Sequence, residues 1–316
     1  MISGILNIYK EKGYTSHDVV AKLRGIVGQK KIGHTGTLDP DAEGVLPVCL
    51  GRATKVCGLL TDKDKTYEAV LLLGRTTDTQ DVTGQILSER PLISDGREIT
   101  PETAKACVMS FEGEYDQVPP MYSALKVNGK KLYELAREGK TVERKSRKVS
   151  IRRIRITEID LPRIRMEVEC SKGTYIRTLC HDIGEKLGCG GCMESLLRTR
   201  VGGFALADSR KLGEVEEWVR SGRLHEILIP ADRVFDRMRE VRTSEPYDRF
   251  VHNGSPVELH GLDAGTAGGD GPAFEENEMV RLYDSRGIFV GVYRYDPAGK
   301  RFRPEKMFYD PDQPDK

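Results

Sequence analysis

The chain has 316 residues, 31% of them charged and 38% hydrophobic, which is an ordinary composition for a soluble globular protein of about two domains. No apolar run approaches the roughly 18 residues of a membrane span, and the N-terminus lacks the features of a signal peptide, so we expect a cytoplasmic protein without a membrane partner. The net charge of +1 excludes a uniformly basic surface, and the odd count of seven cysteines argues against a disulfide framework.

Hydrophobic periodicity predicts the elements of the first half of the chain. Residues 16–28 are expected to form a helix capped by Ser16, followed by a glycine-rich loop and a further helical stretch at 54–60. Residues 66–74 resemble a buried strand that ends at a glycine. Thr100 and Pro101 then begin another helix, with threonine as the cap and proline in the first turn.

The second half begins with an irregular basic segment, which a pair of prolines and a short helix near 132–136 interrupt. Residues 164–170 alternate like a half-solvated strand, and apolar stripes predict helices at 176–187 and near 212–219. Residues 280–296 are typical of a β-hairpin. We therefore predict a main domain over residues 1–240 and a small β domain over residues 245–316.

Positive charge gathers between Lys126 and Arg165, a stretch with 14 basic and five acidic residues. A charge run of this kind is often only a solvated face. It is also what a surface that follows nucleic-acid phosphates requires. The run alone leaves both interpretations open.

The stretch GHTGTLDPDAEGVLPVCLGRATK, residues 33–55, matches neither of the common phosphate-binding loops. It has no GxxxxGK[ST] spacing, and it follows a helix rather than a strand, unlike a dinucleotide fingerprint. Its glycines are better explained by an unusual backbone path. Within the stretch, Asp39 precedes a proline that biases it away from helical conformation. Asp39 is therefore either a turn residue or a carboxylate held for chemistry.

A carboxylate held for chemistry needs an orienting cation, and Arg177 is the candidate, in the first turn of a predicted helix after a glycine turn. The alternative is a surface arginine with little energetic role. Cys189 and Cys192 form one CxxC pair without a second pair at zinc-finger spacing, so we expect no metal. His34 alone decides nothing, because a lone histidine is usually hydrogen-bonded locally.

Several motifs, in order along residues 3–205, resemble the TruB family of pseudouridine synthases. GHTGTLDPDAEGVLPVCLGRATK is similar to its signature loop, and KTYEAVLLLGRTTDTQDVTGQI to its Lys-x-Tyr strand and following loop. YDQVPPMYSALKVNGKKLYELAREG resembles its RNA-gripping insertion, here about residues 115–148. CSKGTYIRTLCHDIGEKLG and LLRTRVGGF resemble its last two motifs.

The resemblance implies an α+β fold with a mixed, mostly antiparallel sheet flanked by helices, and a small C-terminal domain of the PUA type. It implies an isomerase that flips the uridine at position 55 out of the tRNA T loop and converts it to pseudouridine. No cofactor is implied, because no atoms are gained. The enzyme would act on the T arm as a monomer, without guide RNA or an obligate protein partner.

The resemblance also assigns site residues. Asp39 would be the catalytic aspartate, Tyr67 the tyrosine that stacks on the base and assists proton removal, and Arg177 the partner of the aspartate. Asp81 would be a second carboxylate near that arginine, His34 would enter the T loop, and Leu197 would line the base pocket. The remaining residues expected to bind RNA are Lys10, Tyr122, Lys126, Lys130 and Lys131.

Two departures from the family pattern stand out. The proline expected after Lys10 is Glu11, and Asp41 and Glu43 replace uncharged residues after Asp39-Pro40. Three alternatives remain open: an RNA-binding protein without catalysis, a guide-dependent synthase of related fold, and a zinc protein. The long insertion favours the stand-alone enzyme over the guide-dependent one.

Overall fold

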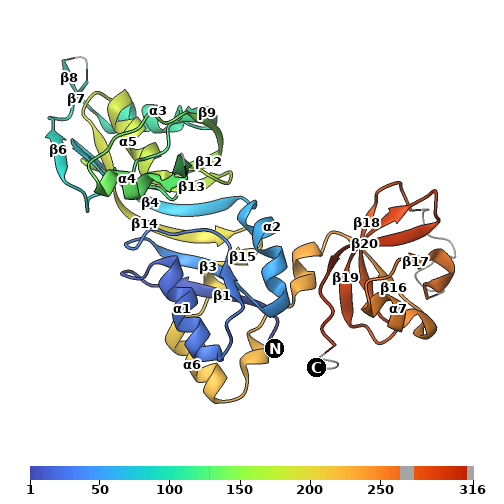
Figure 1. The fold of residues 1–316 in the computed structure, drawn as a ribbon. Coiled ribbons are helices and arrows are strands. Elements are labelled where there is room, and N and C mark those ends of the chain that lie inside the picture. The colour runs from blue at the N-terminus through green and yellow to red at the C-terminus, as the bar shows by residue number, and fades with distance from the viewer. Residues whose placement is uncertain (95, 128, 264–273, 312–316) are drawn as a thin grey trace.

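The computed structural model describes residues 1–94, 96–127, 129–263 and 274–311 (Figure 1). Two β-sheets, one built from the first two-thirds of the chain and one from its end, form separate lobes in the ribbon. The larger lobe carries the glycine-rich stretch and all of the residues predicted for the site. In the described part of the chain, no helix is both long and apolar enough to cross a membrane.

The large sheet has nine strands and is antiparallel at every pairing except one. Its main path runs β1-β3-β14-β4-β13-β12-β9, with β2 beside β3 and β15 beside β14. The strands are β1 (Gly4–Lys10), β2 (Ile32–His34), β3 (Glu43–Leu50), β4 (Lys65–Leu73), β9 (Gly113–Gln117), β12 (Arg147–Asp160), β13 (Arg163–Cys170), β14 (Gly191–Val201) and β15 (Phe204–Ala205). Only β3 and β14 run parallel, where Leu197 lies opposite Glu43. The sheet is therefore mixed and mostly antiparallel, as predicted.

Helices cover this sheet through two apolar clusters. The first joins α3 (Pro101–Met109) and α5 (Ile176–Lys186) to β4, β12 and β13. The second joins α1 (Ser16–Val27) and α6 (Leu212–Arg220) to β1 and β3. These four helices confirm the apolar stripes read from the sequence. Burial of such stripes is the main stabilising contribution of an amphipathic helix.

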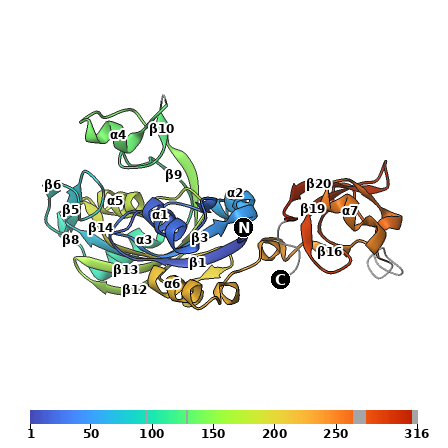
Figure 2. The ribbon, with the colours of Figure 1, turned by 60° about the horizontal axis from the view of Figure 1, so that its bottom comes forward.

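The basic insertion leaves the sheet at the end of β9 and returns at β12. It contains the short strands β10 (Lys126–Val127) and β11 (Lys130–Lys131) and the helix α4 (Leu132–Arg137). Figure 2 shows α4 and β10 standing away from the body of the large sheet. A second excursion, after β4, holds the paired strands β5 (Arg75–Thr77) and β6 (Ile86–Glu89), then β7 (Ile93–Ser94) and β8 (Arg97–Glu98).

The C-terminal lobe is a five-stranded sheet in the order β16-β18-β19-β20-β17. Its elements are β16 (Arg239–Arg242), α7 (Asp248–His252), β17 (Val257–Glu258), β18 (Met279–Tyr283), β19 (Phe289–Asp296) and β20 (Arg301–Met307). The predicted hairpin is β18 with β19. An aromatic cluster of Phe235, Phe289 and Phe308 packs this lobe against Val56 and Leu60, in the segment formed by a 3₁₀ helix (Gly51–Val56) and α2 (Cys57–Thr61).

Three local predictions differ from the structure. The cap of α1 is Thr15 rather than Ser16: its hydroxyl accepts the Asp18 N–H, and Ser16 is buried. Much of the stretch expected to be a loop is the buried strand β3. It was missed because it contains a glycine and a proline, which are uncommon inside strands. The irregular basic segment ends in the 14-residue strand β12, where two register shifts interrupt the alternation of side chains.

Candidate active site

Asp39 lies in the loop that joins β2 to β3, and its backbone is held from several sides. The Leu38 N–H donates to the buried Ser16 hydroxyl at 2.9 Å, and the Asp39 carbonyl accepts the Ala42 N–H at 3.1 Å. Where the loop re-enters the sheet, Gly44 has φ +105°, and a Cβ there would lie 2.2 Å from the Arg198 carbonyl oxygen. The glycine is therefore required by a close approach of two backbones, which is the physical reason for the unusual backbone path predicted from the sequence.

Arg177, in the first turn of α5, grips the Asp39 carboxylate with two nitrogens. Its Nε lies 2.9 Å from Oδ2 and its Nη2 lies 3.2 Å from Oδ1. The arginine side chain is 5% exposed, whereas that of Asp39 is 39% exposed, so the carboxylate is held from behind and open in front. The structure thus brings together the two residues that sequence alone could not place side by side. A fork of this kind fixes both the orientation and the charge of a carboxylate.

Asp81 is the second carboxylate near Arg177, and it lies in the loop after β5. Its Oδ2 is 3.7 Å from Arg177 Nη1, while its Oδ1 accepts from the hydroxyls of Thr79 and Thr83 at 2.8 and 2.6 Å. Arg177 Nη1 also donates to the Thr79 carbonyl at 2.8 Å. The guanidinium is therefore anchored to this loop, and Asp81 acts on it mainly by charge.

Burial removes water from around the Asp39 carboxylate, which raises its pKa above the usual aspartate value. The positive charge of Arg177 opposes that rise. Asp81 adds to the rise because it is a second negative charge, and Lys10 opposes it. The partial exposure of Asp39 limits how far burial acts, because water still reaches its open side. The pKa of Asp39 therefore depends on how closely Arg177 is held against the carboxylate.

Tyr67 is buried in the same apolar cluster as Leu38 and Leu196, close to the Asp39 loop. Across the sheet it is aligned with Arg198, whose guanidinium donates to the carbonyls of Val45 and Gly36 at 2.7 and 3.3 Å. Burial raises the pKa of Tyr67. The phenol is therefore protonated near neutral pH, which suits stacking and hydrogen bonding better than proton removal.

Leu197, the residue expected to line the base pocket, does not lie with this group. It is aligned with Glu68, the exposed neighbour of Tyr67 in β4. Because adjacent strand residues face opposite sides of a sheet, Leu197 points away from the face that carries Tyr67. Leu196, one position earlier, is the buried leucine that packs with Tyr67. The residue assigned from the motif was thus one position too far along the chain.

His34, at the end of β2, is half buried, and its ring lies 5.2 Å from that of His17 in an edge-on arrangement. Its Nδ1 accepts the Gly36 N–H at 3.3 Å, which assigns the proton to Nε2 in the neutral ring. Burial, followed by the charge of His17, lowers the pKa of His34. A neutral imidazole costs less free energy to desolvate than a charged one.

Lys10 was predicted to bind RNA, and the structure corrects this. The side chain is fully buried at the end of β1, and its Nζ donates to the carbonyls of Glu11, Tyr14 and Pro40 at 3.2, 2.6 and 3.0 Å. Burial lowers its pKa to about 8. Lys10 therefore holds the loop on the far side of Asp39 and has no free surface for a phosphate.

Replacing Lys10 with methionine should destabilise the fold by about 1–3 kcal/mol, because the carbonyls of Glu11, Tyr14 and Pro40 lose their charged donor. A thermal melt of the variant measures this loss. The slope of tRNA affinity against salt concentration should stay unchanged, since each phosphate contact contributes about one unit to that slope. A shallower slope without loss of stability would restore the RNA-binding assignment.

Among the insertion residues predicted for RNA, the structure separates two kinds. Lys126 and Lys130 are exposed, and Lys130 lies 3.5 Å from Glu138. Lys131 is half buried over the Tyr133 ring and donates to its hydroxyl at 3.1 Å. Tyr122 is half buried, and its carbonyl accepts from Arg177 Nη2 at 2.8 Å. Tyr122 therefore links the insertion to the candidate active site, a role that no sequence pattern indicated.

The basic run divides at the start of β12. Beyond that point Arg155, Arg163 and Arg165 pair with Glu167, Glu194 and Glu158 on the same sheet. This part is a solvated, internally paired face of the sheet. The insertion before it keeps the exposed Lys126 and Lys130, so the interpretation as a phosphate-binding surface stays open for that segment.

The two unexpected acids after Asp39 are both engaged locally. Glu43 accepts the Tyr9 hydroxyl at 3.0 Å, and Asp41, half exposed, lies 3.9 Å from Lys12. Neither contacts the Arg177 fork. Among the residues that the structure describes, no group of three His, Cys, Asp or Glu side chains could hold a metal ion.

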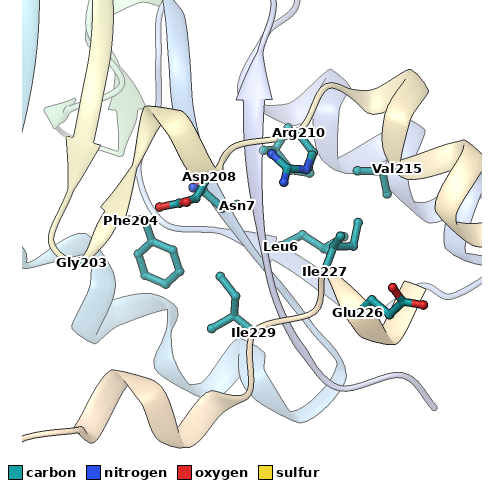
Figure 3. A pocket seen from close by; sticks show the side chains of 11 residues that line it. Leu6, Asn7, Gly203, Phe204, Asp208, Arg210, Val215, Glu226, Ile227 and Ile229 are labelled. Atoms are coloured by element: carbon teal, nitrogen blue, oxygen red, sulfur yellow. The ribbon is translucent and has the colours of Figure 1, made fainter. Parts of the chain in front are cut away.

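A cavity of about 310 Å³ lies elsewhere, at the edge of β1 (Figure 3). Its walls are mostly apolar and its polar members include Asn7, Asp208 and Arg210. None of the residues predicted for the site lines it. The candidate site is instead centred on the partly exposed carboxylate of Asp39.

Two family models match consecutive parts of the chain. The TruB family pseudouridylate synthase N-terminal domain matches residues 24–176. The C-terminal domain of tRNA pseudouridylate synthase B matches residues 177–236. The boundary falls immediately before Arg177, within α5.

Curated relatives match over nearly the whole length. A tRNA pseudouridine synthase B of Lachnoclostridium phytofermentans is 51% identical over 97% of this chain and 100% of its own. One of Clostridium perfringens is 41% identical over 98% of this chain and 100% of its own.

Solved structures share the fold. A Cbf5–Nop10–Gar1 complex contains a chain that is 26% identical, with a TM-score of 0.69 over 98% of this chain and 86% of that one. An archaeal box H/ACA Nop10–Cbf5 complex gives 25% identity and a TM-score of 0.67 over 98% and 87%.

Proposed function

The chain belongs to the TruB family of pseudouridylate synthases, and we propose that it isomerises the uridine at position 55 in the T loop of tRNA. The observation that carries this proposal is the two-nitrogen grip of Arg177 on a partly exposed Asp39, beside the buried Tyr67. The full-length similarity to tRNA pseudouridine synthases supports tRNA as the substrate. We place the enzyme in the cytoplasm, where its substrate is found.

The reaction breaks the N1–C1′ bond of uridine, turns the uracil, and forms a C5–C1′ bond. The proton on C5 leaves and N1 gains one, so atoms and electrons balance without a cofactor. An ionised Asp39 can act as nucleophile or as base in this sequence. Arg177 keeps the carboxylate charged and directs it toward the open side of the site, where the nucleotide would enter.

The uridine must leave its stack before Asp39 can reach it, which costs a few kcal/mol. We propose that the Tyr67 ring stacks on the extruded uracil, which returns about 1–3 kcal/mol. Leu196 replaces Leu197 as the apolar residue expected beside the base. His34 is proposed to fill the space that the nucleotide vacates.

The insertion supports action without a guide RNA. Its exposed Lys126 and Lys130 stand on a segment that projects from the sheet, where they can contact phosphates of the T arm. Tyr122 connects the same segment to Arg177. We propose a monomer that grips its substrate with this insertion and with the C-terminal lobe, whose sheet includes β16 and so begins before the boundary at residue 245 predicted from the sequence.

The test is release of tritium from tRNA labelled at C5 of uridine, followed by mapping of the modified position. Stoichiometric release with pseudouridine at position 55 supports the proposal. Tight binding of tRNA with no release would identify an RNA-binding protein without catalysis. The control is Glu43→Gln, which keeps the Asp39–Arg177 pair and should release tritium normally.

The raised pKa of Asp39 predicts the acid limb of the pH–rate profile. Activity requires the ionised carboxylate, so the rate rises with pH through this pKa, and that limb should lie above the usual aspartate value of about 4. Arg177→Gln removes the opposing positive charge and should move the limb to still higher pH. Single-turnover rates between about pH 4 and 8 measure both. A limb that does not move in this variant would contradict the coupling.

A further inference from the structure

Gln117 is the last residue of β9, and its side chain is fully buried. The oxygen and the nitrogen of its amide both bond to the backbone of Tyr175. Its Oε1 accepts the Tyr175 N–H at 2.8 Å, and its Nε2 donates to the Tyr175 carbonyl at 3.0 Å. The side chain thus pairs with the Tyr175 backbone as a neighbouring strand would. Its Nε2 also contacts the Tyr115 hydroxyl, which helps to fix the orientation of the amide.

Tyr175 is the residue from which α5 begins. It is the N-cap of that helix, in extended conformation, and has no side-chain capping bond of its own. Its carbonyl accepts the first helical bond, from the Leu179 N–H at 3.0 Å. The residue that holds Tyr175 therefore sets where the helix starts and how it is rotated. Arg177 follows two residues later, within that first turn.

Two further contacts at this end of α5 come from the loop after β5. Thr178 donates to the Gln80 side chain at 2.7 Å, and Arg177 donates to the Thr79 carbonyl at 2.8 Å. Both act through side chains. Gln117, at the end of the edge strand β9, is instead bonded to the backbone at the start of the helix.

Gln117 is also the residue from which the basic insertion departs. Five residues on, the Tyr122 carbonyl accepts from Arg177 Nη2 at 2.8 Å. The base of the insertion is therefore attached twice to the unit formed by Tyr175 and Arg177. A displacement of this segment would therefore move the Arg177 guanidinium in two ways. One is through the Gln117 bonds to Tyr175, and the other is through the Tyr122 carbonyl.

We propose that Gln117 is a positioning residue that holds Arg177 against Asp39, so that the seating of the insertion determines the geometry of the active site. The inference rests on the proposed function, because it assigns Arg177 to the same reaction. Gln117 itself has no contact with the reacting atoms. Its effect passes through the Tyr175 backbone.

The test is Gln117→Glu, which keeps the length and the acceptor oxygen but loses the Nε2 donor. The single-turnover rate constant should fall about 100-fold, the scale expected for a misplaced catalytic group. Affinity for tRNA should change by no more than about threefold, because no RNA contact is lost.

The acid limb of the pH–rate profile supplies a readout that simple destabilisation would not move. The charged groups that face Asp39 are Arg177, Asp81 and Lys10, and Arg177 opposes the rise in its pKa. Loosening Arg177 should therefore move the limb to higher pH in Gln117→Glu. An unchanged rate, or a slower rate with an unmoved limb, would overturn the proposal.

The matched control is Val149→Ala on β12. Val149 is buried and lies opposite Tyr115 in the same strand pair, but it has no bond to Tyr175. It should lower the melting temperature and leave the rate and the acid limb unchanged. Equal losses of rate at equal losses of stability in both variants would show that Gln117 only stabilises the fold.

Hydrogen exchange on the unaltered protein tests the same bond even if Gln117→Glu does not fold. The first amides of a helix have no acceptor within it and exchange quickly. The Tyr175 amide should exchange much more slowly than those of Ile176 and Arg177, and fast exchange at Tyr175 would contradict the proposal. Failure of the unaltered protein to form pseudouridine would count against the function, whereas an active protein with an unaffected Gln117→Glu variant would count against this inference alone.

Discussion

Asp39→Asn should abolish pseudouridine formation, with a loss of at least about four orders of magnitude in the single-turnover rate. Asparagine has nearly the same shape, but it is neither a nucleophile nor a base. Arg177 would still donate hydrogen bonds to the carbonyls of Thr79 and Tyr122 and would still lie near the charge of Asp81. The fold should therefore tolerate the change. tRNA affinity should stay within about threefold of the original, because the exposed lysines of the insertion are untouched.

Single-turnover assays on a T-arm hairpin, beside a filter-binding titration, measure both quantities. Asp41→Asn is the matched control, because Asp41 is two residues away, half exposed, and only 3.9 Å from a surface lysine. It should retain nearly full activity. Substantial pseudouridine formation by Asp39→Asn would remove Asp39 from the mechanism.

Arg177→Lys should lower the single-turnover rate by about 100-fold to 1,000-fold although the positive charge is kept. Arg177 uses three nitrogens to reach both oxygens of Asp39 and the carbonyls of Thr79 and Tyr122. A lysine ammonium is a single point with three donors and cannot span these positions. The Asp39 carboxylate would then be free to rotate, and the link to the insertion would be lost.

Arg200→Lys provides the comparison, since Arg200 pairs with Glu169 at 2.6 Å on a half-exposed face away from the Asp39 loop. That exchange should be nearly neutral, as is usual for exposed ion pairs. If Arg177→Lys were equally mild, the two-nitrogen grip would not be needed for catalysis. Arg177 would then serve only as a positive charge beside Asp39.

The elements that the sequence predicted well share a local physical cause. Thr100 and Pro101 begin α3, as expected, because capping and the fixed proline φ act within one turn. The elements that it missed depend on more distant neighbours. Strand β3 is buried along nearly its whole length and carries Pro47 and Gly44, so neither alternation nor β propensity marks it. Strand β12 was hidden by its charged face and by two bulges.

The sequence motifs were sufficient to name the candidate residues for the chemistry. The resemblance of its motifs to the TruB family pointed to Asp39, Tyr67 and Arg177. The sequence also indicated that the glycines allow an unusual backbone path, and at Gly44 the positive φ and the close approach to β14 bear this out.

How these candidates meet depends on the packing of the folded chain. Asp39 and Arg177 are 138 residues apart in the chain, and their pairing depends on how α5 docks against the loop after β2. The same folding buried Lys10, turned Leu197 to the other face of the sheet, and joined Gln117 to Tyr175. Such outcomes depend on strand register and on burial, and one residue of register moves a side chain from one face to the other.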